Sequence, residues 1–169
     1  MKRCLSVLCG AGLLALFTSC TAPPPQQADT HDADVKAIKD TEVQWNKDFE
    51  AKDVDKLVAH YTDDAVLMNP GSPSVSGKDA IRAALKGMVS DPALTLKFEA
   101  SRIDTSKSGE FGFTQGAYSM TMTDPGTKKV INDKGSYVTV YKKQADGSWR
   151  AVDDIATSEV LGAPPPAKK

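Results

Sequence analysis

The sequence is poor in cysteine and histidine, which limits the chemistry that its folded part can perform. The three cysteines, Cys4, Cys9 and Cys20, all lie near the N-terminus, so no disulfide framework can hold a domain further along the chain. The two histidines, His31 and His60, are too few to supply a zinc ligand set. A Ser/His/Asp signature is also missing, and we expect neither a metal nor another cofactor.

An excess of basic charge is missing as well. The formal net charge of the chain is -1, from 21 basic and 22 acidic residues. Residues 1–19 contain Lys2 and Arg3 and no acidic residue, so the rest of the chain keeps 19 basic residues against 22 acidic ones, a net charge of -3. Proteins that bind nucleic acid concentrate basic residues, and we therefore expect no nucleic-acid partner.

The one long apolar run lies at the N-terminus and has the form of an export signal. A short basic segment at residues 1–3 precedes the run from Leu5 to Phe17, which is too short to span a bilayer. The following Phe17-Thr18-Ser19-Cys20 resembles a bacterial lipobox, although the common motif has Leu where Phe17 stands. We expect residues 1–19 to be a lipoprotein signal peptide and Cys20 to be lipidated. The alternative is a plain secretory signal with Cys20 as an incidental thiol.

Two proline-rich segments set the limits of the domain. Residues 20–31 include Pro23-Pro24-Pro25, which favours an extended tether, and residues 162–169 form a second segment of this kind. The domain is therefore expected at residues 32–161. Thr21 is not the aspartate that retains lipoproteins in the inner membrane, so we expect an exported protein anchored in the bacterial cell envelope, with the outer membrane or periplasm favoured.

The first half of the domain has helical periodicity. Apolar residues predict a helix over about 32–51, interrupted on its apolar stripe by Glu42, which is either an acid at the surface edge or a buried one. Asp53 can cap a second helix that extends to Tyr61 and ends at Asp63-Asp64, before a short strand at 65–68. A loop and a third helix over about 78–88 follow.

The second half alternates with a period of two, which predicts strands over about 94–100, 111–122, 130–142 and 149–158. Gly112 and Gly116 within the second of these strands indicate bends or bulges. Asp146-Gly147 is typical of a hairpin turn. Helices followed by an antiparallel meander predict an α+β fold, in which a curved sheet wraps three N-terminal helices and leaves a cavity between them.

A set of short segments spread over nearly the whole domain resembles the SnoaL-like branch of the nuclear transport factor 2-like superfamily. The resemblance implies a cone-shaped, cystatin-like α+β barrel, as in ketosteroid isomerase, and is greatest to single-domain secreted members of the branch. The segments that carry it are Trp45, 51–55, 61–65, 69–71, 76–82, 108–110, 114–118, 135–137 and 146–149.

The resemblance also allows the acid–base residues of ketosteroid isomerase to be sought here. That enzyme uses an Asp base, with a Tyr and a protonated Asp holding the oxyanion. Counted from Asp53, the place of the tyrosine falls on Trp45 and that of the base on Asn69, whose amide cannot relay a proton. The second acid falls at residues 134–136, where no carboxylate stands, although Asp133 is adjacent. Ketosteroid isomerase chemistry is therefore not expected.

Asp153 and Asp154 lie in the last predicted strand, where neighbouring side chains alternate between the two faces of the sheet. The resemblance to the family implies that Asp154 is the one on the inward face. Asp154 is either an edge acid paired with a base such as Arg82 or Lys97, or a pocket acid with a raised pKa. It is the one candidate catalytic residue. The lining of the expected cavity comprises Trp45, Tyr61, Asn69, Tyr118, Tyr137 and Asp154.

Three functions remain open. The first is a lipid-anchored module that binds a small apolar molecule in its cone without catalysis, because the pocket is aromatic and has few acid–base groups. The second is an isomerase, cyclase or hydrolase of the SnoaL-like kind that uses Asp154. The third is a dimeric protein-interaction domain.

We also expect a homodimer, because members of the superfamily commonly pair through the outer face of the sheet. Val138 and Val140 lie on that face, and Tyr137 lies on the inward face of the same strand.

The lipid anchor can be tested in a bacterial host fed with an alkyne-labelled fatty acid. Replacing Cys20 with Ala removes the acceptor thiol, so the label should be lost and the protein should leave the membrane fraction. Cys9→Ala, inside the signal, should keep both the label and the membrane association. Labelling that persists in the Cys20→Ala variant would contradict the prediction.

Overall fold

The structure is a computed structural model that describes residues 30–124 and 126–159. The signal peptide at 1–19, Cys20, the tether as far as residue 29, the last two residues expected in the domain (160–161) and the tail at 162–169 lie outside the described residues. Within the described part of the chain, no helix combines the length and the apolar character needed to cross a membrane. The lipid anchor stays a prediction from the sequence.

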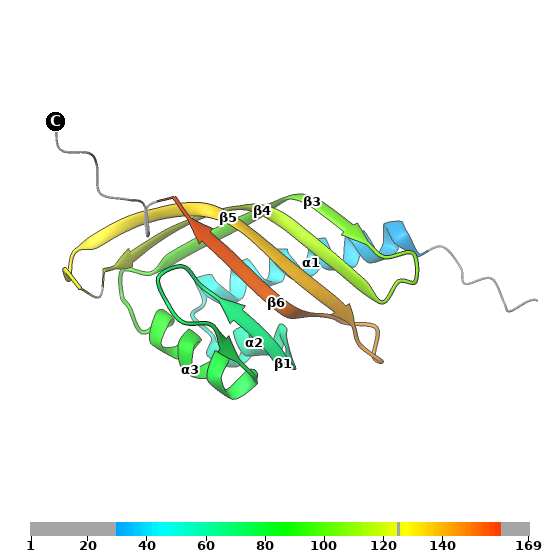
Figure 1. The fold of residues 1–169 in the computed structure, drawn as a ribbon, viewed down its shortest axis with the longest axis horizontal. Helices are drawn as coiled ribbons and strands as arrows, with labels where there is room; N and C mark the ends of the chain where they lie inside the picture. The colour runs from blue at the N-terminus through cyan, green and yellow to red at the C-terminus, as the bar shows by residue number, and fades with distance from the viewer. Residues whose placement is uncertain (1–29, 125, 160–169) are drawn as a thin grey trace, which may run out of the picture.

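A curved six-stranded sheet lies over three helices, which share one of its faces (Figure 1). The helices are α1 (His31–Glu50), α2 (Val54–Ala59) and α3 (Lys78–Val89). The strands are β1 (Tyr61–Met68), β2 (Val75–Ser76), β3 (Thr95–Thr105), β4 (Phe111–Thr123), β5 (Val130–Lys143) and β6 (Trp149–Ser158). Their order is β2-β1-β6-β5-β4-β3, with β1 parallel to β6 and the other neighbours antiparallel.

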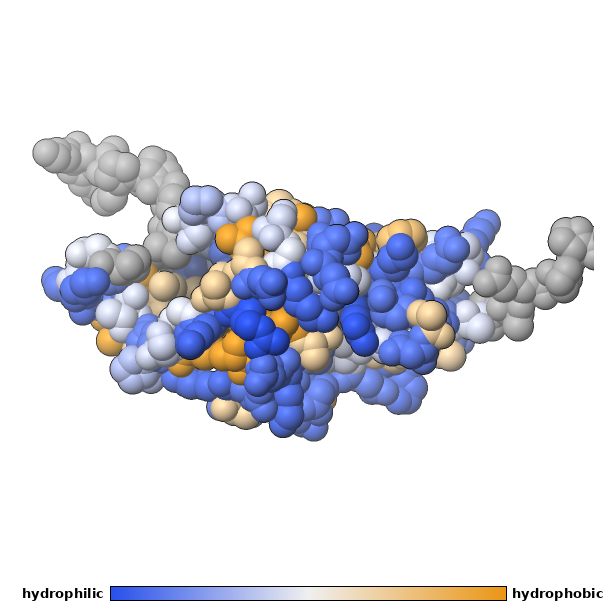
Figure 2. Space-filling view, turned by 90° about the horizontal axis from the view of Figure 1, so that it is seen from below, coloured by the Kyte–Doolittle hydropathy of each residue, from blue (hydrophilic) through white to orange (hydrophobic). Residues whose placement is uncertain are grey.

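The predicted α+β class is confirmed, with helices first and the meander β3–β6 after them. The barrel is not complete, because the edges β2 and β3 do not pair within residues 30–124 and 126–159. The sheet therefore forms an open, curved cover. Seen from below, the molecule is mostly hydrophilic, and hydrophobic side chains gather near the middle of this face (Figure 2).

Helix α1 crosses the concave face beneath β3 and β4 (Figure 1). Its predicted stripe is buried at Ile38, Trp45 and Phe49, and burying a side chain of this size stabilises the fold by roughly 1.5–3 kcal/mol. Asn46 fixes the helix to β3, because its amide donates to the carbonyl of Phe98 at 3.0 Å and accepts from the N–H of Phe98 at 3.1 Å. One side chain thus satisfies both backbone groups of a residue on the edge strand.

The segment after α2 corrects the sequence prediction. Helix α2 ends at Ala59, and Tyr61 is the first residue of β1 instead of the last helical position. Tyr61 pairs with Ala151 of β6, whose N–H donates to the carbonyl of His60 at 2.8 Å. Asp63-Asp64 are exposed at an irregularity in this pairing and do not end the helix. Local spacing could not reveal this, because the partner strand lies far along the chain.

Gly116 marks a close approach between neighbouring strands of the sheet. A Cβ at this position would stand 2.0 Å from the carbonyl oxygen of Glu99 and 2.7 Å from the ring of Tyr137. The pairing of β3 with β4 shifts by one residue at the same place, between Ala100 and Arg102. The bend that the sequence predicted near Gly116 is present, and it brings the ring of Tyr137 across the concave face.

The strand β5 shows how the two faces of the sheet differ. Tyr137, Thr139 and Tyr141 are buried on the side of the helices. Val138 and Val140 lie on the opposite face and are half-buried in the single chain. The homodimer expected through this face stays a prediction.

Glu42 is buried on α1, so its alternative placement at the surface edge is wrong. Its carboxylate accepts hydrogen bonds from Tyr137 at 2.9 Å and from Tyr141 at 3.2 Å. Burial raises the pKa of Glu42 above its ordinary value, and these hydroxyls offset part of the effect. The negative charge of Asp154 raises the pKa further.

This raised pKa predicts how stability depends on pH. Below pH 4.5, the ordinary value, Glu42 is protonated in the folded and the unfolded chain alike. As the pH rises through the raised pKa of the folded state, the unfolded chain releases its proton more readily, and the free energy of unfolding falls. Glu42→Gln stays neutral, so in urea unfolding its stability relative to the wild type should increase as the pH rises.

Glu99→Gln is the matched control, because Glu99 is exposed on β3. Its stability relative to the wild type should change little over the same pH range. A Glu42→Gln variant whose stability follows the wild type at every pH would show that burial does not perturb this carboxyl.

Candidate functional site

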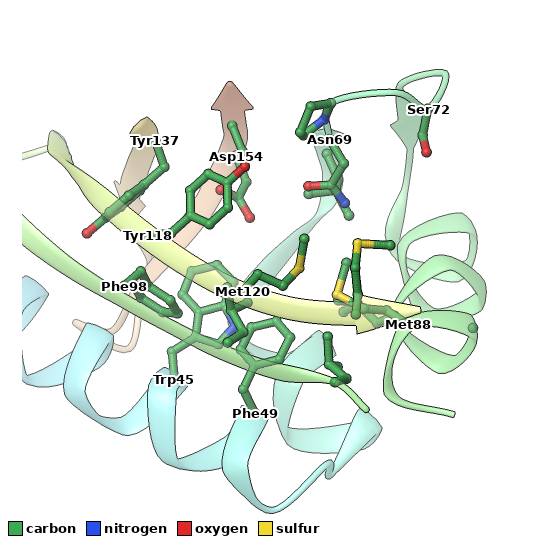
Figure 3. A pocket seen from close by; sticks show the side chains of 18 of the residues that line it. Trp45, Phe49, Asn69, Ser72, Met88, Phe98, Tyr118, Met120, Tyr137 and Asp154 are labelled. Carbon is green, nitrogen blue, oxygen red and sulfur yellow. The ribbon is translucent and has the colours of Figure 1, made fainter. Parts of the chain in front are cut away.

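A cavity of about 340 Å³ lies between the concave face of the sheet, α1, α3 and the loop after β1. Figure 3 shows labelled side chains from all four regions around this common space. All six residues that the sequence placed in the lining do line it, and whether they bind a ligand stays a prediction. The lining consists of Trp45, Phe49, Tyr61, Leu67, Asn69, Pro70, Ser72, Leu85, Gly87, Met88, Asp91, Leu94, Leu96, Phe98, Tyr118, Met120, Met122, Thr123, Tyr137, Thr139, Asp154 and Ala156.

Aromatic rings form one wall of the cavity. The Trp45 ring meets that of Tyr61 edge-on at 5.0 Å between centroids and that of Phe98 at 6.0 Å. Phe98 in turn meets Tyr137 at 5.5 Å. The lining also contains the methionines Met88 and Met120, and in Figure 3 Met88 lies away from the aromatic rings, beside α3. Thioether side chains are flexible and polarizable, so this part of the lining can adapt to ligands of different shapes.

Asp154 on β6 is the acid that faces this space (Figure 3). Tyr61 donates to its Oδ2 at 2.7 Å, and Thr139 donates to its Oδ1 at 3.2 Å. Burial raises the pKa of Asp154 above its ordinary value, and the two hydroxyls offset part of this effect. Burial and the charge of Asp154 also raise the pKa of Tyr61, which therefore keeps its proton and remains a donor.

The alternative in which Asp154 is an edge acid paired with a base is wrong. Arg82 pairs with Asp55, and Lys97 pairs with Glu50 at 3.5 Å. Both pairs are exposed. The partners of Asp154 are hydroxyl groups inside the fold, as expected for a pocket acid.

The other two tyrosines of the cavity are also bonded to carboxylates. Tyr137 donates to Glu42, as described above, and Tyr118 donates to Asp133 at 2.8 Å. Asp133 accepts a second bond from Ser158 at 2.6 Å. Burial and these carboxylates raise the pKa values of both tyrosines. Every tyrosine hydroxyl of the cavity therefore has an acceptor within the protein.

Asn69 follows β1 and points its amide into the cavity beside β6 (Figure 3). Leu67 pairs with Asp154 in the parallel ladder, so Asn69, two residues later, shares the inward face. The side chain of Asn69 makes no hydrogen bond to any other described residue. Its amide is thus available both to donate to a bound molecule and to accept from it.

His60 supports the aromatic wall from behind, a role that sequence reasoning missed. Its ring stacks on Trp45 at 4.8 Å with an interplanar angle of 12°. Asp48 lies 2.8 Å from its Nε2. Burial lowers the pKa of His60, and Asp48 offsets part of that change. The only signal in the sequence was the position of His60 at the end of a helix, which does not indicate stacking.

Several other lining residues were also not assigned to the site. Phe49 lies one helical turn after Trp45, so its position on the same stripe could have indicated it. Thr139 follows Tyr137 by two residues on β5, and strand alternation could have indicated its bond to Asp154. The place of Phe98 in the lining depends on how β3 lies against α1, and that of Asp91 on the path of the chain between α3 and β3; no local pattern reveals either. In the described ranges, no cluster of three His, Cys, Asp or Glu side chains could hold a metal.

Comparison with solved structures identifies similar folds. A ketosteroid isomerase-like protein from Erwinia carotovora atroseptica has a TM-score of 0.66 at 24% identity, over 75% of this chain and 96% of that one. A conserved protein from Planctomyces limnophilus has a TM-score of 0.64 at 19% identity, over 75% and 98%. An NTF2-like protein with a cystatin-like fold from Novosphingobium aromaticivorans has a TM-score of 0.62 at 14% identity, over 78% and 85%. At these identities, the likeness shows the fold alone.

A search of curated proteins found no match. The sequence model of the SnoaL-like domain, by contrast, matches residues 43–152, which run from α1 into β6 and include more than half of the chain. This chain therefore belongs to the SnoaL-like domain family, and its fold is similar to that of NTF2-like proteins.

Proposed function

We propose that the domain binds a small, largely apolar molecule in the cavity beneath its sheet. The observation that carries the proposal is an unfilled space of about 340 Å³ whose walls are mostly aromatic, aliphatic and thioether side chains. Ligand pockets are typically concave and apolar, with a few polar groups that orient the ligand. Asp154 and Asn69 supply such groups at one end. An interaction domain with a filled cone would have no such space.

The hydrogen bonds of the tyrosines favour binding over oxyanion chemistry. An oxyanion hole needs donors aimed at the space where charge develops. In this cavity the hydroxyls of Tyr61, Tyr118 and Tyr137 already donate to carboxylates. Counted from Asp53, the resemblance puts Asn69 at the place of the isomerase base and Trp45 at that of the oxyanion tyrosine. This count supports binding over the acid–base chemistry of the isomerase.

A cavity-filling variant tests binding. Ala156 lines the cavity on β6, so Ala156→Phe should occupy the space that a ligand needs. Native mass spectrometry of the purified wild-type protein should show a bound molecule or, after addition, a bound apolar probe such as decanol. The Ala156→Phe variant should show neither, with a melting temperature at or above that of the wild type.

Thr157→Phe is the matched control, since Thr157 is exposed on the same strand and does not line the cavity. It should bind as the wild type does. Trp45 gives a second readout in a Trp149→Phe background, because Trp149 lies outside this cavity. If no probe binds, or if both phenylalanine variants bind equally well, the cavity is not the site.

A second function, catalysis with Asp154 as a general base, is favoured by the environment of that residue. Its raised pKa is typical of catalytic carboxyls, and the exposed part of the group faces the cavity. One solved relative is named as ketosteroid isomerase-like. An enzyme of this kind would remove a proton from a carbon next to a carbonyl group, with Asn69 as the hydrogen-bond donor to the carbonyl oxygen.

Deuterium exchange measures that step directly. If Asp154 is a base, 2-decanone in D₂O should gain deuterium next to its carbonyl, and the rate should rise with pH through the raised pKa of Asp154. Asp154→Asn should slow the exchange by about 10²–10⁴-fold. Asp153→Asn, on the opposite face of the same strand, should exchange as the wild type does. Equal rates in the two variants would exclude Asp154 as the base.

The cellular setting is part of the same proposal. The lipobox-like sequence ending at Cys20 supports a domain held at the cell envelope on a proline-rich tether. The half-buried Val138 and Val140 on the outer face support a homodimer. Neither feature is needed for the cavity to bind its ligand.

A further inference from the structure

The charged side chains that line the cavity among the described residues are both acidic. Asp154 and Asp91 are in its lining, while Glu42 and Asp133 lie directly behind Tyr137 and Tyr118. The lining contains no Lys, Arg or His side chain. A bound carboxylate or phosphate would therefore meet negative charge without a basic partner, and the cavity is unsuited to anionic molecules.

Three of these acids also lack a basic partner among the described residues. Hydrogen bonds from the backbone N–H and the hydroxyl of Thr123 lower the pKa of Asp91, and the nearby charge of Lys52 lowers it further. By contrast, Asp154, Glu42 and Asp133 form no salt bridge within the part of the chain that the structure describes, and their hydrogen-bond donors are hydroxyls.

Asp34, a buried acid elsewhere in the fold, is paired with a cation, because it accepts from Lys143 at 2.6 Å. Asp48 lies 2.8 Å from His60, whose ring carries a charge only when it is protonated and whose pKa is lowered by burial. A buried carboxylate without a cation is costly, and a protein avoids the cost by protonating the group or by supplying an opposite charge. At Asp154, which faces the cavity, a ligand can supply that charge.

The aromatic wall is suited to the same kind of group. Trp45, Tyr61, Phe98 and Tyr137 form a continuous series of ring contacts, and Tyr61 donates directly to Asp154. Ring faces attract cations within about 6 Å of the centroid. A carboxylate beside several rings is a combination that recognises an organic ammonium group and leaves the rest of the molecule in apolar surroundings.

We propose that the natural ligand is an organic cation, an apolar molecule whose protonated amine donates to Asp154 beside the aromatic wall. The inference rests on the binding function proposed above. Each oxygen of Asp154 accepts one hydroxyl and keeps a further acceptor site for the ammonium N–H groups. The amide oxygen of Asn69, on the same inward face, can accept another. No proton is transferred, and no co-reactant is required.

Three probes with the same decyl chain separate the effect of charge from that of apolar contact. Decylamine, decanol and decanoate are titrated into the protein by calorimetry at neutral pH, below the concentrations at which they form micelles. Decylamine should bind at least tenfold more tightly than decanol, and decanoate should bind most weakly. Ala156→Phe should weaken binding of all three probes.

Two isosteric variants locate the ammonium group. Asp154→Asn keeps an oxygen that can accept from Tyr61 but loses the negative charge, so the advantage of decylamine over decanol should fall below threefold. Asp153→Asn removes the same charge from the opposite face of β6 and should keep the full advantage. This control excludes a general attraction of amines to an acidic protein.

The outcomes distinguish this inference from the function on which it rests. If decanol binds as tightly as decylamine, or if Asp154→Asn and Asp153→Asn behave alike, the ligand is not a cation held by Asp154, although the cavity still binds apolar molecules. If none of the three probes binds to the wild type, both proposals are wrong. The wild-type comparison needs no variant, so it decides the question even if Asp154→Asn does not fold.

Discussion

The hydrogen bonds from Tyr137 and Tyr141 to Glu42 are the constraint on which this fold and its cavity depend. They join the concave face of β5 to the middle of α1 at a buried point where water cannot replace them. Removing one partner of a buried hydrogen bond costs about 1–3 kcal/mol. The geometry of the bonds sets the distance between helix and sheet, and the ring of Tyr137 on its way to Glu42 becomes part of the cavity wall.

The cavity remains open because the inward face of the sheet places glycines next to tyrosines whose hydroxyls are hydrogen-bonded to carboxylates. Gly116 and Gly135 leave no room for a Cβ, and the rings of Tyr137 and Tyr118 lie against them. Each ring is held at its far end by a carboxylate, so it cannot fold into the empty space. The hydroxyl–carboxylate bonds therefore stabilise the fold and also keep the site available.

The sequence predicted the fold class and most element boundaries, because helical and strand periodicities are local properties. It also placed six residues on one cavity, since the superfamily pattern fixes which strand positions face inward. It could not place Tyr61 on a strand, because that depends on pairing with Ala151 ninety positions later. Nor could it indicate that His60 stacks on Trp45, because helical spacing does not specify which rings meet across elements.

The charge of the ligand determines what Asp154 can do. A neutral, apolar ligand that displaces water would raise the pKa of Asp154 further, because desolvation penalises the ionised form. The protonated acid would then donate to the ligand and would be a poor base. A cationic ligand would lower the same pKa, keep the carboxylate ionised and use it only as an anchor.

Catalysis requires a third situation, in which Asp154 is ionised while the substrate is neutral. Once Asp154 has taken a proton from that substrate, another group must stabilise the negative charge that develops on it. Asn69 is the only amide side chain that lines the cavity within the described part of the chain, and a single amide donor is a weak substitute for the tyrosine and protonated aspartate of the isomerase. The acidic surroundings of the cavity oppose the negative charge of an enolate in the same way that they favour a cation. The proposed recognition of a positively charged ligand and the poor stabilisation expected for an oxyanion thus follow from the same arrangement of carboxylates.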